Sequence, residues 1–275
     1  MSGNVTASIV LYHQCPEDVT PLFEELAKDA ALLAWVVVDN GGSVDACNLA
    51  ESMGARCLRP GRNLGYGASH NLAMRSLVDC ASPYHLVLNP DIRLGSGILA
   101  QLAKMMDAMP EVGLVMPQIL YPDGTEQRLC KQIPTPLDLI SRRFLGRFGR
   151  ALFANQLVRY ELRRLDMRIA REIPCLSGCF MFIRSAALRE VGYFDERYFM
   201  YMEDVDLCRR IGAKYKTVFY PEVAVTHGYT KGSYRDPMLL KYHLQSAFKY
   251  FSKWGWIFDS GRDRLNRKAI SLDPQ

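Results

Sequence analysis

Three carboxylates within four residues form the densest group of chemically capable side chains in the sequence. Glu203, Asp204 and Asp206 directly follow the apolar run FMYM. A carboxylate that is partly withdrawn from water can act as a general base and take a proton from a hydroxyl group. Acids at a helix start also complement the helix dipole, and Arg209 and Arg210 could pair with them. The spacing alone leaves a catalytic and a purely structural interpretation open.

Other polar residues follow the ends of apolar, strand-like runs. Asp39 and Asn40 end one such run, Asn89-Pro90-Asp91 ends another, and a loop rich in glycine and asparagine spans residues 61–67. In open parallel sheets a ligand binds beyond the carboxyl ends of the strands, so we expect these acids and amides to meet at a ligand site. The sequence contains neither GxGxxG nor a Walker A motif, which argues against a dehydrogenase and an ATPase.

The elements that must position these residues alternate along the chain. We expect strands at 6–11, 35–39, 56–58, 84–88, 113–117, 179–184, 217–220 and 223–226. Helical patterns cover 47–53, 68–80, 136–172, 185–191, 204–211 and 237–254. Because the strand cores are continuously apolar, the pattern predicts an α/β fold with a mostly parallel sheet covered by helices on both faces.

Composition limits the class of protein. The chain has 275 residues, of which 49% are hydrophobic, enough for one large α/β domain with a helical extension. No run of 18 apolar residues lacks a charge, and the N-terminus has no basic region before its first apolar run, so we expect neither a membrane-spanning helix nor a signal peptide. The eight cysteines show no CxxC spacing and are expected to be reduced thiols, mostly buried.

Several motifs in a fixed order resemble one known family. They are VVVDNGGS, NLGYGASHN (63–71), LVLNPDI (86–92), SGCFMFIRSAALREVGYFDE (177–196) and the following run to EDVDLCRR. Together they span about residues 6 to 230 and resemble the family 2 glycosyltransferases, in the branch of bacterial rhamnosyltransferases. The C-terminal segment LLKYHLQSAFKYF resembles the same branch. The resemblance implies a GT-A fold, a nucleotide-sugar donor, a divalent metal ion (Mg²⁺ or Mn²⁺) and an inverting displacement.

The resemblance also implies roles for individual residues. Asp204 is the expected base that takes the proton of the acceptor hydroxyl, with Glu203 beside it as an orienting residue. Asp91 and His227 are the expected metal ligands. Lys231, Ser233 and Arg235 form a loop that could clamp the diphosphate. The residues expected to bind the nucleotide-sugar are Leu11, Tyr12, His13, Asp39, Asn40, Asn63, Gly65, Tyr66, Asn71, Asn89 and Asp91.

The metal site departs from the common pattern of the family. Members usually carry Asp-x-Asp where this chain has Asn89-Pro90-Asp91, and an asparagine is a weak metal ligand. The Asn-Pro-Asp form is typical of the rhamnosyltransferase branch, so it is interpreted as a variant site, although the same residues also suit a plain turn. His227 could equally be a structural hydrogen-bonding residue, and Asp39 a turn residue.

Two segments favour a membrane surface. Residues 142–171 contain nine arginines with hydrophobic residues at roughly helical spacing, and the run 248–258 combines lysines with tryptophans. Such patterns occur in helices that lie on anionic membranes, and equally in solvated surface helices. No nucleic-acid motif accompanies the charge of +5. Oligomeric state is left open.

The expected organisation is a GT-A domain over 1–235, followed by a C-terminal helical segment over 236–275. A nucleotide-binding half covers 1–92, and an acceptor half covers 93–235 with a basic helical insert at 136–172. The expected reaction moves L-rhamnose from dTDP-β-L-rhamnose to an undecaprenyl-diphosphate-linked saccharide in O-antigen or related polysaccharide assembly, at the cytoplasmic face of the inner membrane. Another NDP-hexose donor, such as UDP-galactose or UDP-glucose, and a non-catalytic carbohydrate-binding protein of the same fold are the alternatives.

Overall fold

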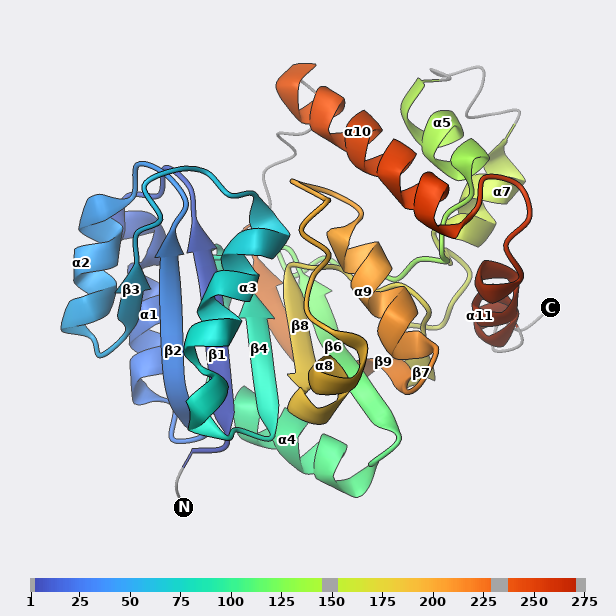
Figure 1. The fold of residues 1–275 in the computed structure, drawn as a ribbon. Helices are drawn as coiled ribbons and strands as arrows, with labels where there is room; N and C mark the ends of the chain where they lie inside the picture. Colours follow the sequence, from blue (N-terminus) through green and yellow to red (C-terminus); the bar gives the residue numbers. More distant parts are fainter. Residues whose placement is uncertain (1–2, 145–152, 229–236, 271–275) are drawn as a thin grey trace.

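The chain forms one continuous sheet with helices on both sides (Figure 1). A computed structural model describes residues 3–144, 153–228 and 237–270. The described strands are β1 Val5–Leu11, β2 Leu32–Asp39, β3 Arg56–Leu58, β4 Tyr84–Leu88, β5 Ile92–Arg93, β6 Val112–Leu120, β7 Arg171–Glu172, β8 Phe180–Arg184 and β9 Lys216–His227. The described helices are α1 Pro16–Lys28, α2 Val44–Ser52, α3 Tyr66–Ser76, α4 Ile98–Ala108, α5 Pro136–Phe144, α7 Ala154–Tyr160, α8 Ser185–Val191, α9 Glu203–Gly212, α10 Pro237–Trp254 and α11 Ser260–Ile270.

The strand order is β3-β2-β1-β4-β8-β6-β9-β5, with β7 paired to β9. Strands β3, β2, β1 and β4 run parallel, as do β6 and β9. Strand β8 lies antiparallel between β4 and β6 and joins these two parallel groups. The prediction of a mostly parallel α/β sheet is therefore confirmed, with the antiparallel strands concentrated in the second half of the chain.

Alternate residues of β2 enter different cores, because both faces of the sheet are covered. Trp35 packs edge-on against Phe23 of α1, with ring centroids 5.2 Å apart. Val36 and Val38 belong to a separate cluster that includes Ala73 of α3. This two-sided burial explains why the strand is continuously apolar in sequence.

The C-terminal helices pack beside α9 and form a second, smaller core (Figure 1). Tyr250 and Phe251 of α10 and Leu265 of α11 meet Val205 of α9 there. A buried ion pair joins Arg209 of α9 to Asp259, and the Arg209 guanidinium lies 4.0 Å from the centre of the Trp254 ring. Among the described helices, none is long and apolar enough to cross a membrane.

The prediction of a basic helix over residues 136–172 is wrong in part. Helices α5 and α7 fall within it, but residues 161–169 form turns. Leu162 has a φ of +47°, a left-handed conformation that ends a helix, and Leu162, Leu165 and Met167 are buried in the main core. Tertiary burial of these apolar residues outweighs the helical spacing. The two strands expected at 217–226 are one strand, β9.

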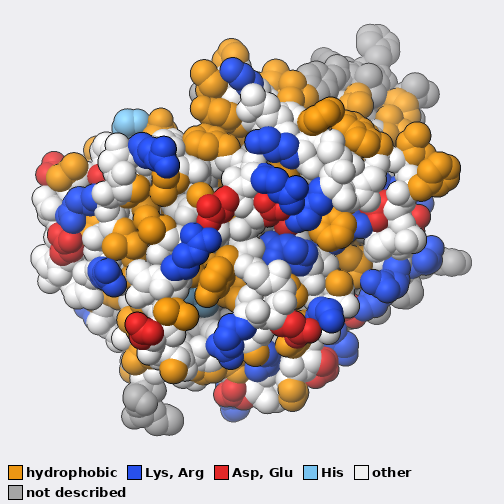
Figure 2. All heavy atoms as spheres, in the orientation of Figure 1, with side chains coloured by type: hydrophobic (Ala, Val, Ile, Leu, Met, Phe, Trp, Pro, Cys, Tyr) orange, Lys and Arg blue, Asp and Glu red, His pale blue; other side chains and the backbone are white. Residues whose placement is uncertain are grey.

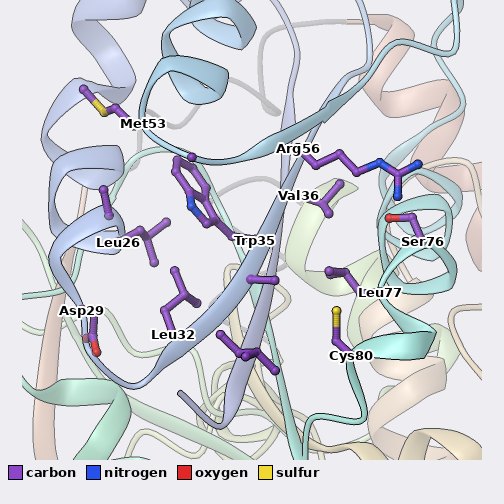
Figure 3. Close-up of a pocket in the computed structure, with 14 residues that line it drawn as sticks. Leu26, Asp29, Leu32, Trp35, Val36, Met53, Arg56, Ser76, Leu77 and Cys80 are labelled. Carbon is purple, nitrogen blue, oxygen red and sulfur yellow. The ribbon is translucent and has the colours of Figure 1, made fainter. Parts of the chain in front are cut away.

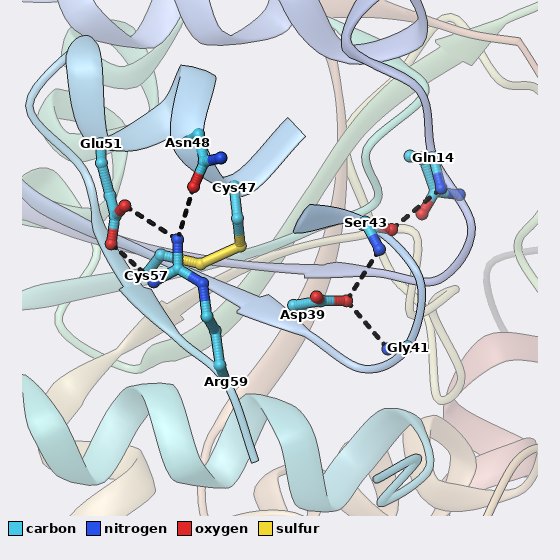
Figure 4. Close-up of a disulfide and its surroundings, with 9 residues drawn as sticks. All are labelled: Gln14, Asp39, Gly41, Ser43, Cys47, Asn48, Glu51, Cys57 and Arg59. Carbon is cyan, nitrogen blue, oxygen red and sulfur yellow. Dashed lines mark hydrogen bonds and ion pairs between the residues drawn. A yellow bond between two sulfur atoms is a disulfide. The ribbon is translucent and has the colours of Figure 1, made fainter. Parts of the chain in front are cut away.

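The expectation that all eight cysteines are reduced is also wrong. Cys47 of α2 and Cys57 of β3 form a disulfide, with their Cα atoms 5.9 Å apart (Figure 4). Helix α2 packs against β3, which brings two cysteines ten residues apart within bonding distance. The other six are free thiols, and those at positions 130, 175, 179 and 208 are buried.

Candidate functional site

The predicted ligand residues gather where the parallel strands end. Leu11 at the end of β1 is paired in register with Asp39 at the end of β2, and β4 ends just before Asn89. His227 is the last residue of β9. It pairs with Ile92 of β5, the residue that directly follows Asp91 in the sequence. The acids, amides and histidine that the sequence predicts at strand ends therefore lie at one end of the sheet, where the parallel strands terminate.

The turn after β2 is held by Asp39 (Figure 4). Its Oδ1 accepts hydrogen bonds from the backbone N–H groups of Gly41 and Ser43, at 3.0 and 3.1 Å. The Ser43 hydroxyl accepts one from the N–H of Gln14 at 3.0 Å, which links this turn to the one after β1. Asp39 is thus a turn residue. Its second carboxylate oxygen is not used in these bonds, and nucleotide binding by Asp39 stays a prediction.

The turn after β1 presents two aromatic rings. Tyr12 is 49% exposed and its ring lies 4.3 Å from that of His13, which has a φ of +60°. Leu11, also expected at the nucleotide, is completely buried in the main core, and its carbonyl accepts the N–H of Asn40. The side chain of Leu11 therefore supports the turn from inside the core, and a contact of Leu11 with the nucleotide stays a prediction for its backbone.

The glycine- and asparagine-rich loop is fixed by Asn40. The Asn40 amide donates to Asn63 Oδ1 at 2.7 Å, and its oxygen accepts the N–H of Leu64 at 2.7 Å and the hydroxyl of Ser69 at 2.9 Å. Both atoms of the Asn40 amide are thereby engaged inside the protein. Asn40 and Asn63 position the loop.

Gly65 is required where this loop meets the segment before α9. Its φ is +86°, and a Cβ atom there would lie 2.1 Å from the carbonyl oxygen of Phe199. The next residue, Tyr66, donates its N–H to the same carbonyl at 2.9 Å. Only glycine permits this close approach, which sets the start of α3 against the acceptor half of the chain.

The side chain of Asn71 forms hydrogen bonds inside the protein, and its predicted contact with the nucleotide-sugar stays a prediction. Asn71 is completely buried, and its amide donates to the carbonyl of Phe194 and to Glu196 at 2.8 and 2.9 Å, while its oxygen accepts the N–H of Phe194 at 3.0 Å. Asn71 therefore anchors the segment that leads to α9 onto α3.

The three carboxylates of the acidic cluster point to different places. Asp206 is completely buried and bonds Arg210 at 2.7 Å, and Lys253 and Trp254 of α10 at 2.6 and 2.8 Å. Asp204 is only partly buried and stands at the start of α9. The structural interpretation thus holds for Asp206, whereas Glu203 and Asp204 lie on the side of the strand ends.

A strained turn aims Glu203 and Asp204. Tyr201 and Met202, immediately before them, have φ values of +67° and +69°. Two consecutive left-handed residues other than glycine are costly and are typical of functional sites. The Oδ2 of Asp204 accepts the N–H of Gly178 at 3.1 Å, and its Oδ1 accepts the N–H of Val205 at 2.8 Å.

Tyr66 connects the two acidic groups of the site. Its hydroxyl donates to the carbonyl of Gly178 at 2.6 Å. Burial raises the pKa of Tyr66 well above its usual value, and nearby acidic groups, Asp204 and Asp91 among them, raise it further. The strand end and the helix start also meet at residues 178 and 179, because Gly178 donates its N–H to Asp204 and the carbonyl of Cys179 accepts the N–H of Asn89 at 2.9 Å, so they belong to one site.

Glu203 is buried, and one of its carboxyl oxygens has no described hydrogen-bond partner. It is 6% exposed, and no described group forms a hydrogen bond with its Oε2. Burial raises the pKa of Glu203 well above its usual value, and the neighbouring Asp204 adds to the rise. A raised pKa favours the protonated form of a carboxyl group, which can donate a hydrogen bond.

His227 is oriented by Gln127, a residue that sequence reasoning missed. The Gln127 amide donates to the carbonyl of His227 at 2.8 Å, which leaves its oxygen facing His227 Nδ1 at 2.9 Å. Because an amide oxygen can only accept, Nδ1 carries the proton and donates. His227 Nε2 then faces Asp91 Oδ1 at 3.2 Å and the Asn89 amide at 3.4 Å.

This geometry suits a divalent cation. Two adjacent ligands of an octahedral ion, each about 2.1 Å from it, lie about 3 Å apart, close to the observed spacing of Nε2 and Oδ1. A second hydrogen bond that fixes the ring of a ligating histidine is also usual in metal sites. The described residues contain no group of three metal-ligating side chains, so the diphosphate and water would complete the shell. The expected clamp residues Lys231, Ser233 and Arg235 lie outside the described residues.

A separate hollow of about 440 Å³ lies at the opposite end of β2 (Figure 3). Trp35, Leu32 and Leu26 line it, with Met53 and Leu77 nearby. These residues belong to the beginnings of strands and the ends of helices, away from the carboxyl ends where ligands bind. It is not part of the candidate site.

Comparison with known proteins decides the family. A family model described as "Glycosyltransferase like family 2" matches residues 23–238. The chain belongs to this family. It is therefore a glycosyltransferase, of the hexosyltransferase kind, and its resemblance to the rhamnosyltransferase branch is confirmed.

Named relatives agree with this assignment. The glycosyltransferase is 33% identical over 230 residues (79% of this chain and 74% of the relative) to N-acetylglucosaminyl-diphospho-decaprenol L-rhamnosyltransferase of Mycobacterium tuberculosis. It is 23% identical to rhamnosyltransferase WbbL of Escherichia coli K12, over 94% of this chain and 97% of the relative. The crystal structure of GalNAc-T7 with UDP, GalNAc and Mn²⁺ shares the fold, with a TM-score of 0.63 at 13% identity, covering 96% of this chain and 50% of that one. The expectation of a GT-A fold is confirmed.

The burial of Glu203 predicts a pH-dependent stability difference. Its pKa in the folded state lies above the usual 4.5, so above pH 4.5 the unfolded chain loses this proton while the folded chain keeps it. Stability then falls with rising pH, by up to about 1.4 kcal/mol per pH unit, until the folded-state pKa is reached. Glu203→Gln removes this titration, so the free energy of unfolding of the variant should gain on wild type between pH 5 and pH 8.

Chemical denaturation at both pH values measures the gain. Glu17→Gln is the matched control, because Glu17 is an exposed acid in the first turn of α1. A difference between Glu203→Gln and wild type that stays constant with pH would contradict the burial of a protonated carboxyl group.

Proposed function

We propose that this glycosyltransferase moves L-rhamnose from dTDP-β-L-rhamnose to a lipid-linked saccharide, with inversion at the anomeric carbon. The observation that carries the proposal is that residues 178 and 179 link Asp204 at the start of α9 to the strand end at Asn89, beside the facing pair of Asp91 and His227. The choice of sugar and lipid-linked acceptor is supported by the names of the two rhamnosyltransferase relatives.

In the proposed reaction Asp204 is the general base. The acceptor hydroxyl oxygen attacks the anomeric carbon of the donor, its proton passes to the Asp204 carboxylate, and the bond from that carbon to the nucleoside diphosphate breaks. The N–H groups of Gly178 and Val205 hold the carboxylate in place. An alcohol is a poor nucleophile, so a base fixed at this point lowers the barrier of the attack.

Glu203 would work as a neutral neighbour of this base. A protonated Glu203 adds no second negative charge beside Asp204, and its unpaired Oε2 is suited to hydrogen-bond a sugar hydroxyl. Glu203 would thereby orient the acceptor or the donor sugar.

Asp91 and His227 would hold the divalent ion, Mg²⁺ or Mn²⁺, with Asn89 beside them. The bound ion would balance the charge of the departing nucleoside diphosphate. An imidazole ligand favours Mn²⁺ over Mg²⁺, and the structural relative bound to Mn²⁺ agrees with that preference. Lys231, Ser233 and Arg235 remain proposed diphosphate contacts, as do Tyr12, His13 and Asp39 for the nucleoside.

The proposed setting is the assembly of O-antigen or a related surface polysaccharide, with the enzyme at the cytoplasmic membrane surface. A lipid-linked acceptor requires that the enzyme reach a bilayer. Large apolar side chains on and after α10, which include Leu244, Phe248 and Phe258, are exposed and interleaved with lysines (Figure 2). This surface supports a peripheral attachment.

Asp204→Asn should lower transfer at least about 1,000-fold while donor binding persists, because the amide keeps the shape but cannot accept the proton. Single-turnover transfer and isothermal titration with the donor measure the two quantities. Asp45→Asn, at an exposed acid in the first turn of α2, is the matched control. Transfer by Asp204→Asn near the wild-type rate would overturn the assignment of the base.

A donor screen tests the sugar. Thermal shift with dTDP-rhamnose, UDP-glucose, UDP-galactose and GDP-mannose, each with Mg²⁺ or Mn²⁺, should give a selective stabilisation with dTDP-rhamnose, because at equal concentration the ligand with the lowest Kd stabilises the folded state most. A selective shift with a UDP-hexose would replace the rhamnose proposal and leave the glycosyltransferase assignment intact.

Gln127→Leu should weaken metal binding about 10- to 100-fold, because the ring of His227 loses the partner that fixes its orientation and protonated nitrogen. Mn²⁺ binding followed by electron paramagnetic resonance in the presence of UDP or dTDP gives the affinity without turnover. Gln101→Leu, on the exposed face of α4, is the control. Unchanged Mn²⁺ affinity in Gln127→Leu would show that His227 is not a ligand.

A further inference from the structure

A second polar cavity lies outside the glycosyl-transfer site, between α5, α7 and α11. Its volume is about 670 Å³. The side chains that define its chemistry are Gln132, Asp138, Arg159, Arg262, Asp263 and Arg267. None of them belongs to the strand ends that carry Asp91 and His227.

Two of the buried side chains that line this cavity each carry a hydrogen-bond donor with no described partner. These donors are the Nε2 of Gln132 and the Nη1 of Arg262, in residues that are 6% and 5% exposed. The rest of the Arg262 guanidinium is held in place, since its Nη2 donates to the carbonyl of Ile257 at 2.9 Å. Leaving a buried donor unpaired costs about 1–3 kcal/mol, and more for a charged group, so two in one cavity point to a ligand that accepts hydrogen bonds.

The charge of the cavity favours an anion. Arg159 and Arg267 are exposed at its rim, and neither forms an ion pair with a described residue. Of the two acids, Asp138 is already occupied by the N–H and hydroxyl of Thr135 and by Gln156. Asp263 lies 3.4 Å from Arg262 and is about half exposed. Two arginine side chains thus remain without a carboxylate partner.

An apolar surface adjoins the cavity. Ile257 and Phe258 are 76% and 93% exposed, and they lie in the loop that leads into α11. Arg262 joins the cavity and this surface, because it lines the cavity and its guanidinium also donates to the carbonyl of Ile257. A ligand with a phosphate head and an apolar tail matches this combination.

We propose that this cavity binds the phosphate group of an anionic lipid, with its apolar part against the loop at Ile257 and Phe258. Phosphate accepts several hydrogen bonds and pairs with arginine forks. Two lipids carry the required group: an anionic phospholipid, and the polyprenyl diphosphate to which the proposed acceptor is attached. Only the second choice rests on the proposed function.

Binding is measured without donor or turnover, so its failure is distinguishable from a failure of the proposed function. Titration should show that the wild-type protein binds pyrophosphate. Arg267→Gln should lower the affinity for pyrophosphate about tenfold. Arg264→Gln, which removes an exposed arginine from the same helix outside the cavity, should leave it within about twofold. Gln132→Glu should abolish binding by adding a negative charge, and thermal unfolding checks that each variant folds.

Flotation with three kinds of vesicle then identifies the source of the phosphate. The vesicles contain phosphatidylcholine alone, phosphatidylcholine with phosphatidylglycerol, or phosphatidylcholine with undecaprenyl diphosphate. We expect one of the last two to bind the wild-type protein at least tenfold more than the first, with the gain lost in Arg267→Gln and kept in Arg264→Gln. Equal losses in the two variants would mean general electrostatic attraction and would overturn the site, and pyrophosphate binding with no vesicle preference would overturn the lipid.

Discussion

The packing of the second half of the molecule depends on one buried charge, the carboxylate of Asp206. Withdrawing a carboxylate from water is costly unless it is fully paired, and Asp206 is paired with Arg210 of its own helix and with Lys253 of α10. Lys253 also binds Asp195, in the segment before α9. One lysine therefore joins α10, α9 and that segment, and the strained turn at Tyr201 and Met202 is held between them.

The catalytic arrangement follows from this attachment. The strained turn leaves Glu203 and Asp204 facing the strand ends, and the bond from Tyr66 N–H to the Phe199 carbonyl fixes their position relative to α3. Tyr66 and Asp204 both bond Gly178, so small movements of the segment 192–202 would shift the proposed base relative to the strand ends. Asn71, buried beneath that segment, limits such movement through its bonds to Phe194 and Glu196.

Local chemistry made the strand-end and helix-start residues predictable. Asp39, Asp91, His227 and Asp204 follow apolar runs whose ends must meet in a parallel sheet, and the fold class follows from the same alternation. Contacts between residues far apart in the sequence could not be predicted from local patterns. Gln127 meets His227 across 100 residues, and Arg262 meets the cavity beside Gln132 only after α11 folds back. Leu162 misled for a related reason: its position fits a helical pattern, but tertiary burial decided its conformation.

The antiparallel strand β8 has a consequence for synthesis of the chain. Strands β1 to β4 can pair as soon as residue 88 has emerged, yet the outer edge of β4 obtains its partner only from residues 180–184. For nearly a hundred residues of elongation, the nascent sheet would expose the unpaired backbone of YHLVL, an apolar template for association with other chains. A ribosome-associated chaperone that covers this edge would therefore protect the growing chain from association until β8 has been synthesised.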